Sequence, residues 1–182
     1  MKTEKMLQDT LKSGFDFYKK QFVALIIGTF VAAICMIFII TIPPLIYGLF
    51  FMAIKAVRGQ TVKITDVFSG FNYMVRSYVL FIVAAILTVI GFVFLVIPGI
   101  ALLILFQYAI VVSITEDLGG IGSLQRSVEL ARKNLGFAIV FWIFMAVVNA
   151  IGSAVTVGWL VTFPYTAIAT VIAVKKLGGK VD

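Results

Sequence analysis

The chain of 182 residues contains no histidine and a single cysteine, Cys35. Histidine is the commonest metal ligand in proteins and the commonest general base, so its absence removes both roles. One cysteine cannot form a disulfide within the chain. The sequence also lacks a Gly-rich phosphate loop, a Gly-x-Ser-x-Gly elbow and a Cys-x-x-Cys pair. Ser69 and Ser127 have no histidine to activate them. We therefore expect no catalytic, cofactor-binding or metal-binding residues, and no enzymatic activity.

Acidic residues are scarce, with only eight Asp and Glu in the chain. Glu116-Asp117 is the one adjacent acidic pair. A divalent metal would need more oxygen ligands than these two carboxylates supply. We interpret the pair as a cap of the following turn or as a contact to a basic neighbour.

Charged residues of both signs make up only 13% of the chain, whereas 62% of its residues are hydrophobic. The mean hydropathy is +1.15. A soluble domain is about 45–50% apolar, and a small one buries only about two thirds of the surface that its unfolded chain exposes. A soluble fold of this length has too little interior for so much apolar surface. The composition therefore predicts an integral membrane protein.

Long uncharged runs recur, and proline or glycine interrupts them. The first, from Phe22 to Ile42, is long enough to cross the roughly 30 Å hydrocarbon core at about 1.5 Å per residue. Pro43-Pro44 should stop that helix, because proline cannot donate a backbone hydrogen bond. The remaining apolar segments are Leu45 to Val57, Tyr78 to Ile97 before a break at Pro98-Gly99, Ile100 to Thr115, and Leu135 to Lys175-Lys176 by way of Gly152, Gly158 and Pro164.

The apolar segments fall into three rounds, which begin at Phe22, Tyr78 and Leu135. An amphipathic stretch precedes each round, within residues 7–22, 64–75 and 124–135. The predicted apolar stripe of the second stretch is Ile64, Val67, Phe68, Phe71 and Val75. Ser123 is the predicted N-cap of the third.

The spacing of these features indicates an internal repeat. Gly14-Phe15 precedes Pro43 by nearly the interval that separates Gly70-Phe71 from Pro98. The third round is longer, so either its hairpin tip is longer or Pro164 lies inside a helix. We predict an all-α, polytopic integral membrane protein with one membrane domain, residues 1–182. It should have six transmembrane helices arranged as three Pro/Gly-broken hairpins, each preceded by a cytoplasmic amphipathic helix, in repeat units of about 1–57, 58–118 and 119–182.

The charge distribution predicts the orientation. If the hairpins are as described, all fifteen Lys and Arg and all eight acids fall in connectors on one side of the bilayer. The positive-inside rule assigns that side to the cytoplasm. We therefore expect a multi-pass membrane protein with both termini cytoplasmic.

The basic excess has two interpretations. One is topology alone. The other is that cations beside the amphipathic stripes also hold anionic lipid headgroups, at roughly 1 kcal/mol per basic residue. Nucleic acid is not an expected partner, because the basic residues are spread over four membrane-proximal segments with no base-stacking platform. The candidate headgroup contacts are Lys19, Lys20, Arg76, Arg126, Arg132 and Lys133.

Two uncharged amides, Gln107 and Asn149, lie within the predicted spans, which contain no Asp, Glu or Arg. They either form hydrogen bonds between helices or line a polar pore or pocket. The absence of ionisable groups at this depth argues against an ion-coupled pump. Ala146, Ala150 and Ala154 form a small-residue stripe beside Asn149, of the kind that close helix packing uses.

Part of the second and third rounds resembles a known family. The residues that carry the resemblance are Phe94 to Ile100 with its Ile-Pro-Gly break, Glu116-Asp117-Leu118, Ser123 to Ser127, and Ala131 to Asn134. They are similar to the membrane domain of glycerophosphoryl diester phosphodiesterases and to related prokaryotic six-span families. In the phosphodiesterases that domain anchors a separate catalytic domain. The resemblance therefore implies the fold and a setting in the cell membrane of a prokaryote, and we expect it to carry over no catalysis.

These observations favour a non-catalytic integral membrane protein that acts as a scaffold, an accessory subunit or a lipid-interacting factor. Membrane lipids with anionic headgroups are the expected partners, together with a second copy of the chain or another membrane protein. The alternative is a small oligomeric transporter or channel.

Overall fold

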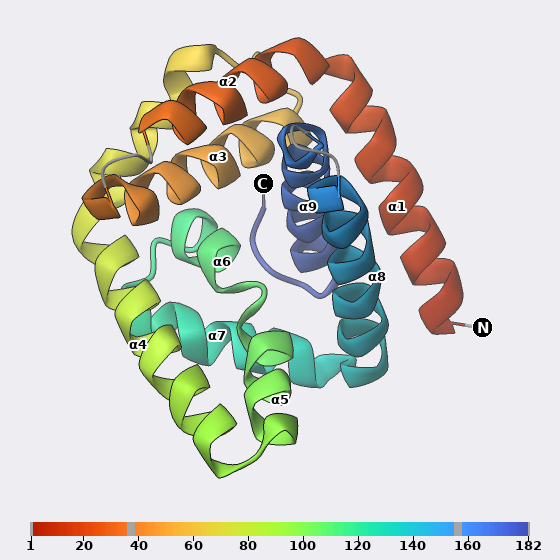
Figure 1. Cartoon of the computed structure of the whole chain (residues 1–182). Coiled ribbons are helices and arrows are strands. Elements are labelled where there is room, and N and C mark those ends of the chain that lie inside the picture. Colours follow the sequence, from red (N-terminus) through yellow and green to blue (C-terminus); the bar gives the residue numbers. More distant parts are fainter. Residues whose placement is uncertain (1, 36–38, 155–157, 182) are drawn as a thin grey trace.

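The computed structural model describes residues 2–35, 39–154 and 158–181, and within these ranges every regular element is a helix (Figure 1). The all-α prediction is confirmed. In chain order the α-helices are α1 Lys2–Lys20, α2 Phe22–Cys35, α3 Ile42–Val57, α4 Met74–Phe94, α5 Val96–Phe106, α6 Ala109–Thr115, α7 Gly120–Lys133, α8 Leu135–Ala154 and α9 Trp159–Lys176. Two 3₁₀ helices, η1 Ile39–Thr41 and η2 Ile64–Tyr73, precede α3 and α4.

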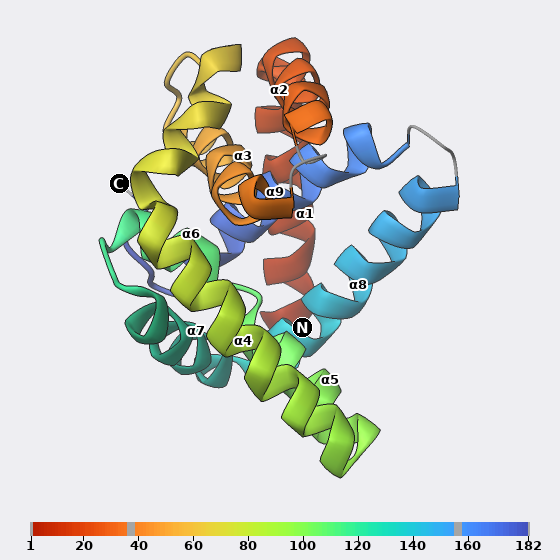
Figure 2. The same cartoon turned by 60° about the vertical axis from the view of Figure 1, so that its left-hand side comes forward.

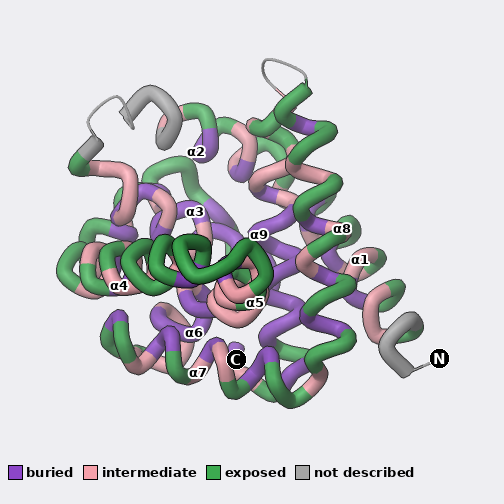
Figure 3. The backbone as a smooth tube through the Cα atoms, turned by 60° about the horizontal axis from the view of Figure 1, so that its bottom comes forward, coloured by how far each residue is buried: buried purple, intermediate pink, exposed green. Residues whose placement is uncertain are grey.

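The centre of the molecule is formed by α9 and α3. From Thr166 to Val174 every residue of α9 is buried, and most of α3 is buried with it. The helices α1, α3 and α8 pack against α9 (Figure 1). Burial is concentrated in this region, whereas α4 and α8 are largely exposed along their lengths and α5 is mostly of intermediate exposure (Figure 3). The helix α9 is therefore the one around which α1, α3 and α8 assemble.

A close backbone approach joins α3 to η2. A Cβ atom on Gly48 would lie 1.7 Å from the carbonyl oxygen of Val67, and one on Gly70 would lie 1.8 Å from that of Pro44. Only glycine fits at these two positions.

The buried face of η2 differs from the predicted stripe. Val67 and Gly70 are buried, whereas Ile64, Phe68, Phe71 and Val75 are exposed. The stripe was predicted with the 3.6-residue period of an α-helix, and that period is wrong for residues 64–73, which form a 3₁₀ helix, whereas Val75 lies in α4. With three residues per turn, positions three apart share a face, which directs Val67 and Gly70 at α3.

The prolines start the returning helices. Pro43 and Pro44 are the second and third residues of α3, and Pro98 is the third residue of α5. Proline suits the first turn, where its missing N–H has no intrahelical acceptor. The predicted break at Pro98-Gly99 is therefore displaced: the chain turns at Leu95, which is extended with φ −172° and ψ 154°. Pro164 lies inside α9, which is the second of the two predicted arrangements.

Three helical segments in the described residues are long and apolar enough to cross a membrane: 64–94, 96–115 and 135–154, of 31, 20 and 20 residues. Shorter apolar helices cover 22–31 and 42–57. The predicted first span, Phe22 to Ile42, passes through residues 36–38, and the third predicted hairpin tip includes residues 155–157; both stretches lie outside the described residues. The three-unit repeat stays a prediction.

Exposed apolar side chains lie along these segments. In α8 every fourth residue is exposed, and the side chains are Leu135, Ile139, Ile143, Val147 and Ile151. The opposite face of the helix, which includes Phe137 and Phe141, is buried. The α4–α5 hairpin and α8 project from the body in different directions (Figure 2). Such one-sided apolar faces are what helices in contact with acyl chains present.

The predicted return span from Ile100 to Thr115 is two helices, because α5 ends at Phe106 and α6 begins at Ala109. The hydroxyl of Ser127 in α7 donates to the carbonyl of Leu105 at 2.6 Å and accepts from the backbone N–H of Tyr108 at 3.2 Å. These bonds replace the helical bonds lost at the break, and irregular backbone is tolerated at membrane depth where protein covers it. The break therefore lies within one candidate membrane span, residues 96–115.

The predicted N-cap at Ser123 is also wrong. The helix α7 begins at Gly120, with Gly119 as N-cap, and the hydroxyl of Ser123 donates to the carbonyl of Gly119 at 2.7 Å from inside the first turn.

Candidate functional site

The C-terminal ends of α1, α3 and α9 bring basic residues to one region. Lys19 and Lys20 lie in the last turn of α1, Arg58 follows α3, and Lys175 lies in the last turn of α9. A cation in the last turn of a helix is favoured by about 0.3–1 kcal/mol, because the helix dipole is negative there. This local preference explains why each helix ends in basic residues, and the packing of the three helices collects them.

Adjoining hollows run between these helix ends, and their volumes are about 580, 320 and 310 Å³. Phe17 lines the first and second, Gln60 the first and third, and Lys175 the second and third. We call this continuous depression the basic trough. The residues that define it are Phe17, Lys19, Lys20, Gln21, Phe22, Arg58, Gln60 and Lys175.

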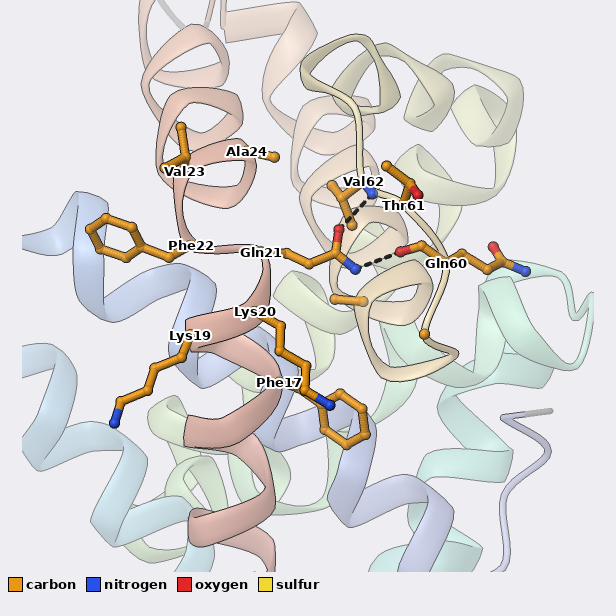
Figure 4. A pocket seen from close by; sticks show the side chains of 12 residues that line it. Phe17, Lys19, Lys20, Gln21, Phe22, Val23, Ala24, Gln60, Thr61 and Val62 are labelled. Carbon is orange, nitrogen blue, oxygen red and sulfur yellow. Dashed lines mark hydrogen bonds between the residues drawn. The ribbon is translucent and has the colours of Figure 1, made fainter.

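Gln21, at the junction of α1 and α2, fixes one wall of the trough. Its side-chain amide donates to the carbonyl of Gln60, and its oxygen accepts from the backbone N–H of Val62 at 2.6 Å (Figure 4). Gly59 turns the chain before this loop with φ +74°, a conformation that favours glycine. Both bonds of Gln21 hold the loop against the helix junction, so the wall is ordered by the protein itself.

Among the described residues, one cation that lines these hollows has a carboxylate partner, because the Nζ of Lys176 lies 3.9 Å from Asp9. None of the ion pairs between described residues includes Lys19, Lys20 or Lys175. The ammonium of Lys20 lies over the ring of Phe17 and that of Lys19 over the ring of Phe15, 4.2 Å from its centroid. The two lysines point in different directions from α1, with Lys20 on the side of the Phe17 ring (Figure 4). Lys20 is therefore the better placed of the two to face a ligand in the trough.

Two other predicted headgroup contacts already have acidic partners. The guanidinium of Arg76 bonds Asp117, and that of Arg126 lies 2.9 Å from Glu116 and 2.9 Å from Glu129. The hydrogen bond and the positive charge of Arg76 hold the pKa of Asp117 below its ordinary value. Of the two interpretations of Glu116-Asp117, a turn cap or a contact to a basic neighbour, the structure therefore supports the contact. A headgroup at Arg76 or Arg126 would have to share the guanidinium with a carboxylate.

Arg132 and Lys133, at the end of α7, are exposed, and among the described residues no ion pair includes either. Arg132 lines a separate apolar hollow between α5, α7 and α8. Lys133 lies near the C-terminal segment, where a Cβ on Gly178 would be 3.6 Å from its Nζ. The structure therefore separates the six predicted contacts into carboxylate-bound and carboxylate-free groups.

The two amides in the predicted spans differ in where their hydrogen-bond acceptors lie. The amide of Gln107 donates to the carbonyl of Ile104 at 2.8 Å and across to that of Ala138 in α8 at 3.1 Å. The amide of Asn149 donates to the carbonyl of Met145 in its own helix at 3.0 Å. Gln107 thus joins two helices and Asn149 does not. The neighbouring stripe of Ala146, Ala150 and Ala154 is exposed rather than packed within the chain.

Within residues 2–35, 39–154 and 158–181, no group of three or more Cys, Asp or Glu side chains is placed to hold a metal ion. Sequence reasoning overlooked Arg58, Gln21, Gln60 and Lys175. The doublet Lys175-Lys176 was a visible signal, but only the packing of α9 against α1 and α3 places it in a hollow that Phe17, the ring beneath Lys20, also lines.

Comparison with known proteins supports a membrane setting. The chain is similar to a bacterial membrane protein. That relative, the UPF0259 membrane protein of Sodalis glossinidius, is 30% identical over 107 residues, which are 57% of this chain and 39% of the relative. Uncharacterised proteins of Mycobacterium bovis and Mycobacterium tuberculosis are each 30% identical over 123 residues, 66% of this chain and 37% of theirs. No family model and no solved structure matches the chain.

The matched region covers well under half the length of these curated relatives. The comparisons bear out the coarser part of the resemblance, distant homology to membrane and uncharacterised proteins of bacteria. The closer likeness to the membrane domain of glycerophosphoryl diester phosphodiesterases stays a prediction.

Proposed function

We propose that the chain is a non-catalytic, multi-pass membrane protein of a bacterial cell membrane that binds anionic phospholipids at the basic trough. The observation that carries the proposal is that Lys20, Arg58 and Lys175 line adjoining hollows of the trough, and that no ion pair between described residues includes any of the three. The Nε of Arg58 donates to the backbone carbonyl of Val181 at 3.5 Å. Bound lipid would let the protein act as a scaffold or an accessory subunit for another membrane protein or a second copy of itself.

The chemistry of the trough suits a phospholipid. A basic residue near an anionic membrane surface contributes roughly 1 kcal/mol of attraction for the headgroup. Lys20 and Lys175 supply ammonium groups for the phosphate, and Gln60 adds a polar side chain beside them. Phe22 and Val23, in the first turn of α2, are exposed apolar side chains on the same wall. A headgroup therefore meets charge and its acyl chains meet apolar surface.

The proposed topology has six spans in three hairpins, with the trough and both termini in the cytoplasm. The segments 64–94, 96–115 and 135–154 support three of these spans by length and hydropathy. The others would be α2, α3 and α9. At about 1.5 Å per residue the 16 residues of α3 fall short of the hydrocarbon core, so local thinning or snorkelling of Lys55 would have to compensate.

Lipid retention during native mass spectrometry tests the trough. Purified protein reconstituted with equal phosphatidylglycerol and phosphatidylcholine should retain phosphatidylglycerol preferentially. The double variant Lys20→Gln/Lys175→Gln should reduce that preference on the order of tenfold. A matched variant, Lys5→Gln/Lys12→Gln, removes the same charge from exposed positions of α1 outside the trough, and it should retain the preference. Equal loss in both variants, or equal retention of the two lipids by the natural protein, would contradict the proposal.

One observation favours the alternative, a small oligomeric transporter or channel. The break between α5 and α6 at Gln107-Tyr108 is the kind of discontinuous helix that lines substrate sites in transporters. Ser127 and Ala138 already satisfy the groups at this break, which supports a structural role instead. The particle mass in detergent separates the two proposals, because a transporter built from this short chain needs a symmetric ring with a hydrated axis.

A further inference from the structure

A small apolar hollow of about 250 Å³ lies between α5, the end of α7 and the start of α8. It shares no lining residue with the basic trough. We call it the Arg132 slot, and its lining residues are Ala101, Ile104, Leu105, Arg132, Leu135 and Ile139.

Arg132 is the one charged residue of the slot. It is exposed in the last turn of α7, and no ion pair in the described part of the chain includes it. Arg126, earlier in the same helix, is held by Glu116 and Glu129. The helix therefore has one guanidinium engaged by carboxylates and one that is available at the rim of an apolar hollow. A guanidinium can bind a phosphate through two parallel hydrogen bonds.

The slot is continuous with the exposed apolar face of α8. Leu135 and Ile139 line the slot, and the same stripe of exposed side chains continues through Ile143 and Val147. On the other side of the slot Ala101 of α5 is also exposed. An acyl chain lying on this face can enter the slot without crossing polar surface.

Hydrogen bonds hold the two walls of the slot together. The amide of Gln107 donates to the carbonyl of Ile104 on one wall and to that of Ala138, beside Ile139, on the other. The hydroxyl of Ser127 donates to the carbonyl of Leu105. These hydrogen bonds join the two walls of the slot. They keep α5 from sliding along α8 and closing the slot.

We propose that the Arg132 slot binds one acyl chain of an anionic phospholipid, with the phosphate on the guanidinium of Arg132. The proposal rests on the membrane setting of the proposed function, but it uses none of the trough residues. An experiment can therefore contradict the lipid site in the slot without contradicting the one in the trough, and the reverse.

Photo-crosslinking tests the slot. The full chain is reconstituted in phosphatidylcholine vesicles that contain phosphatidylglycerol with a diazirine in one acyl chain. After illumination, adducts should concentrate on peptides that contain residues 101–105 and 135–139. Arg132→Gln should reduce these adducts about fivefold, and Arg132→Lys should keep most of them. Ala101→Phe should fill the slot and abolish them, whereas Ile143→Phe, on the same face of α8 beyond the slot, should not.

The trough variant Lys20→Gln/Lys175→Gln serves as the comparison, because it should leave the slot adducts unchanged. Adducts spread evenly along Ile143, Val147 and Ile151 would overturn the slot. Equal labelling by a phosphatidylcholine probe, with no effect of Arg132→Gln in protein that keeps its thermal unfolding transition, would overturn the anionic headgroup.

Discussion

The side-chain amide of Gln107 donates a hydrogen bond to the backbone carbonyl of Ala138 at 3.1 Å, and it thereby joins the α5–α6 break to α8. The two residues are far apart in the sequence and belong to different predicted repeat units. Polar side chains that bond across helices in lipid stabilise the fold by about 0.6 to 2 kcal/mol. The bond therefore makes Gln107 a structural link between two of the predicted spans.

Replacing Gln107 by leucine should lower the free energy of unfolding by about 0.6 to 2 kcal/mol, because both carbonyl acceptors lose their donor. Asn149→Leu is the control. Its amide bonds only within α8, so its loss should cost about 0.5 kcal/mol or less. Thermal unfolding in detergent measures both. A larger effect of Asn149→Leu would show that the helix link is not what stabilises this region.

The contact between α3 and η2 predicts two intolerant glycines. Gly48→Ala or Gly70→Ala would drive a methyl group into a backbone carbonyl, and each should destabilise the protein by about 3 kcal/mol or more. Gly122→Ala makes the same chemical change in α7, where the nearest atom is 3.9 Å away. It should be neutral or stabilise by up to about 1 kcal/mol through helix propensity. The fraction of each variant that elutes as folded protein in size exclusion measures the difference, and a well-folded Gly70→Ala would refute the close approach.

Glu116 joins three segments, because it pairs with Arg126 of α7 and accepts from the backbone N–H of Lys180 at 3.2 Å. Its side chain is only 11% exposed. Glu116→Gln should destabilise the protein by about 1 to 3 kcal/mol. Glu129 binds the same arginine but is 63% exposed, so Glu129→Gln should cost about 0.5 kcal/mol or less. Equal effects in denaturant unfolding would mean that burial does not set the strength of these pairs.

The pair between Arg76 and Asp117 predicts a pH dependence. Because the pKa of Asp117 is lowered in the folded protein, its contribution is complete above the pKa of the unfolded chain. That contribution is lost as the pH falls through the lower folded value. Asp117→Asn should therefore melt at a lower temperature than the natural protein at neutral pH, and the gap should close as the pH falls below about 4.

Asparagine suits this comparison, because Asp117 has φ +54° and asparagine also tolerates that conformation. Added salt should narrow the gap at neutral pH, since the pair is exposed. A gap that persisted after Asp117 is protonated would assign the effect to the backbone rather than to the ion pair.

Local signals in the sequence were enough to predict the helical class and the second hairpin. Pro43 and Pro98 lie within one helical turn of the observed breaks. Such breaks can be predicted because the restrictions that proline places on the backbone act on neighbouring residues only. The three-residue period of η2 could not be predicted from the sequence in this way. This 3₁₀ helix packs closely on α3 through Gly70, and a contact between separate elements is not visible in the local pattern.

The break at Gln107-Tyr108 carries no sequence signal either, since neither residue limits the backbone. Ser127, in a later helix, supplies the hydrogen bonds that make the break tolerable. For the candidate site, Lys20 was predicted from its own segment. Arg58 and Lys175 could not be predicted, because only the assembled helix ends place them in hollows that adjoin the one Lys20 lines.

In the proposed topology, the charged connectors and the trough lie on the cytoplasmic side of a membrane that the apolar helices cross. Single cysteines at Lys63 and Lys180, and at Leu95 in the exposed α4–α5 tip, test it most directly after Cys35 is replaced by alanine. In intact cells, a membrane-impermeant maleimide should fail to label Lys63→Cys and Lys180→Cys until the membrane is permeabilised, and it should label Leu95→Cys from outside. Labelling of all three positions from the same compartment would contradict the account.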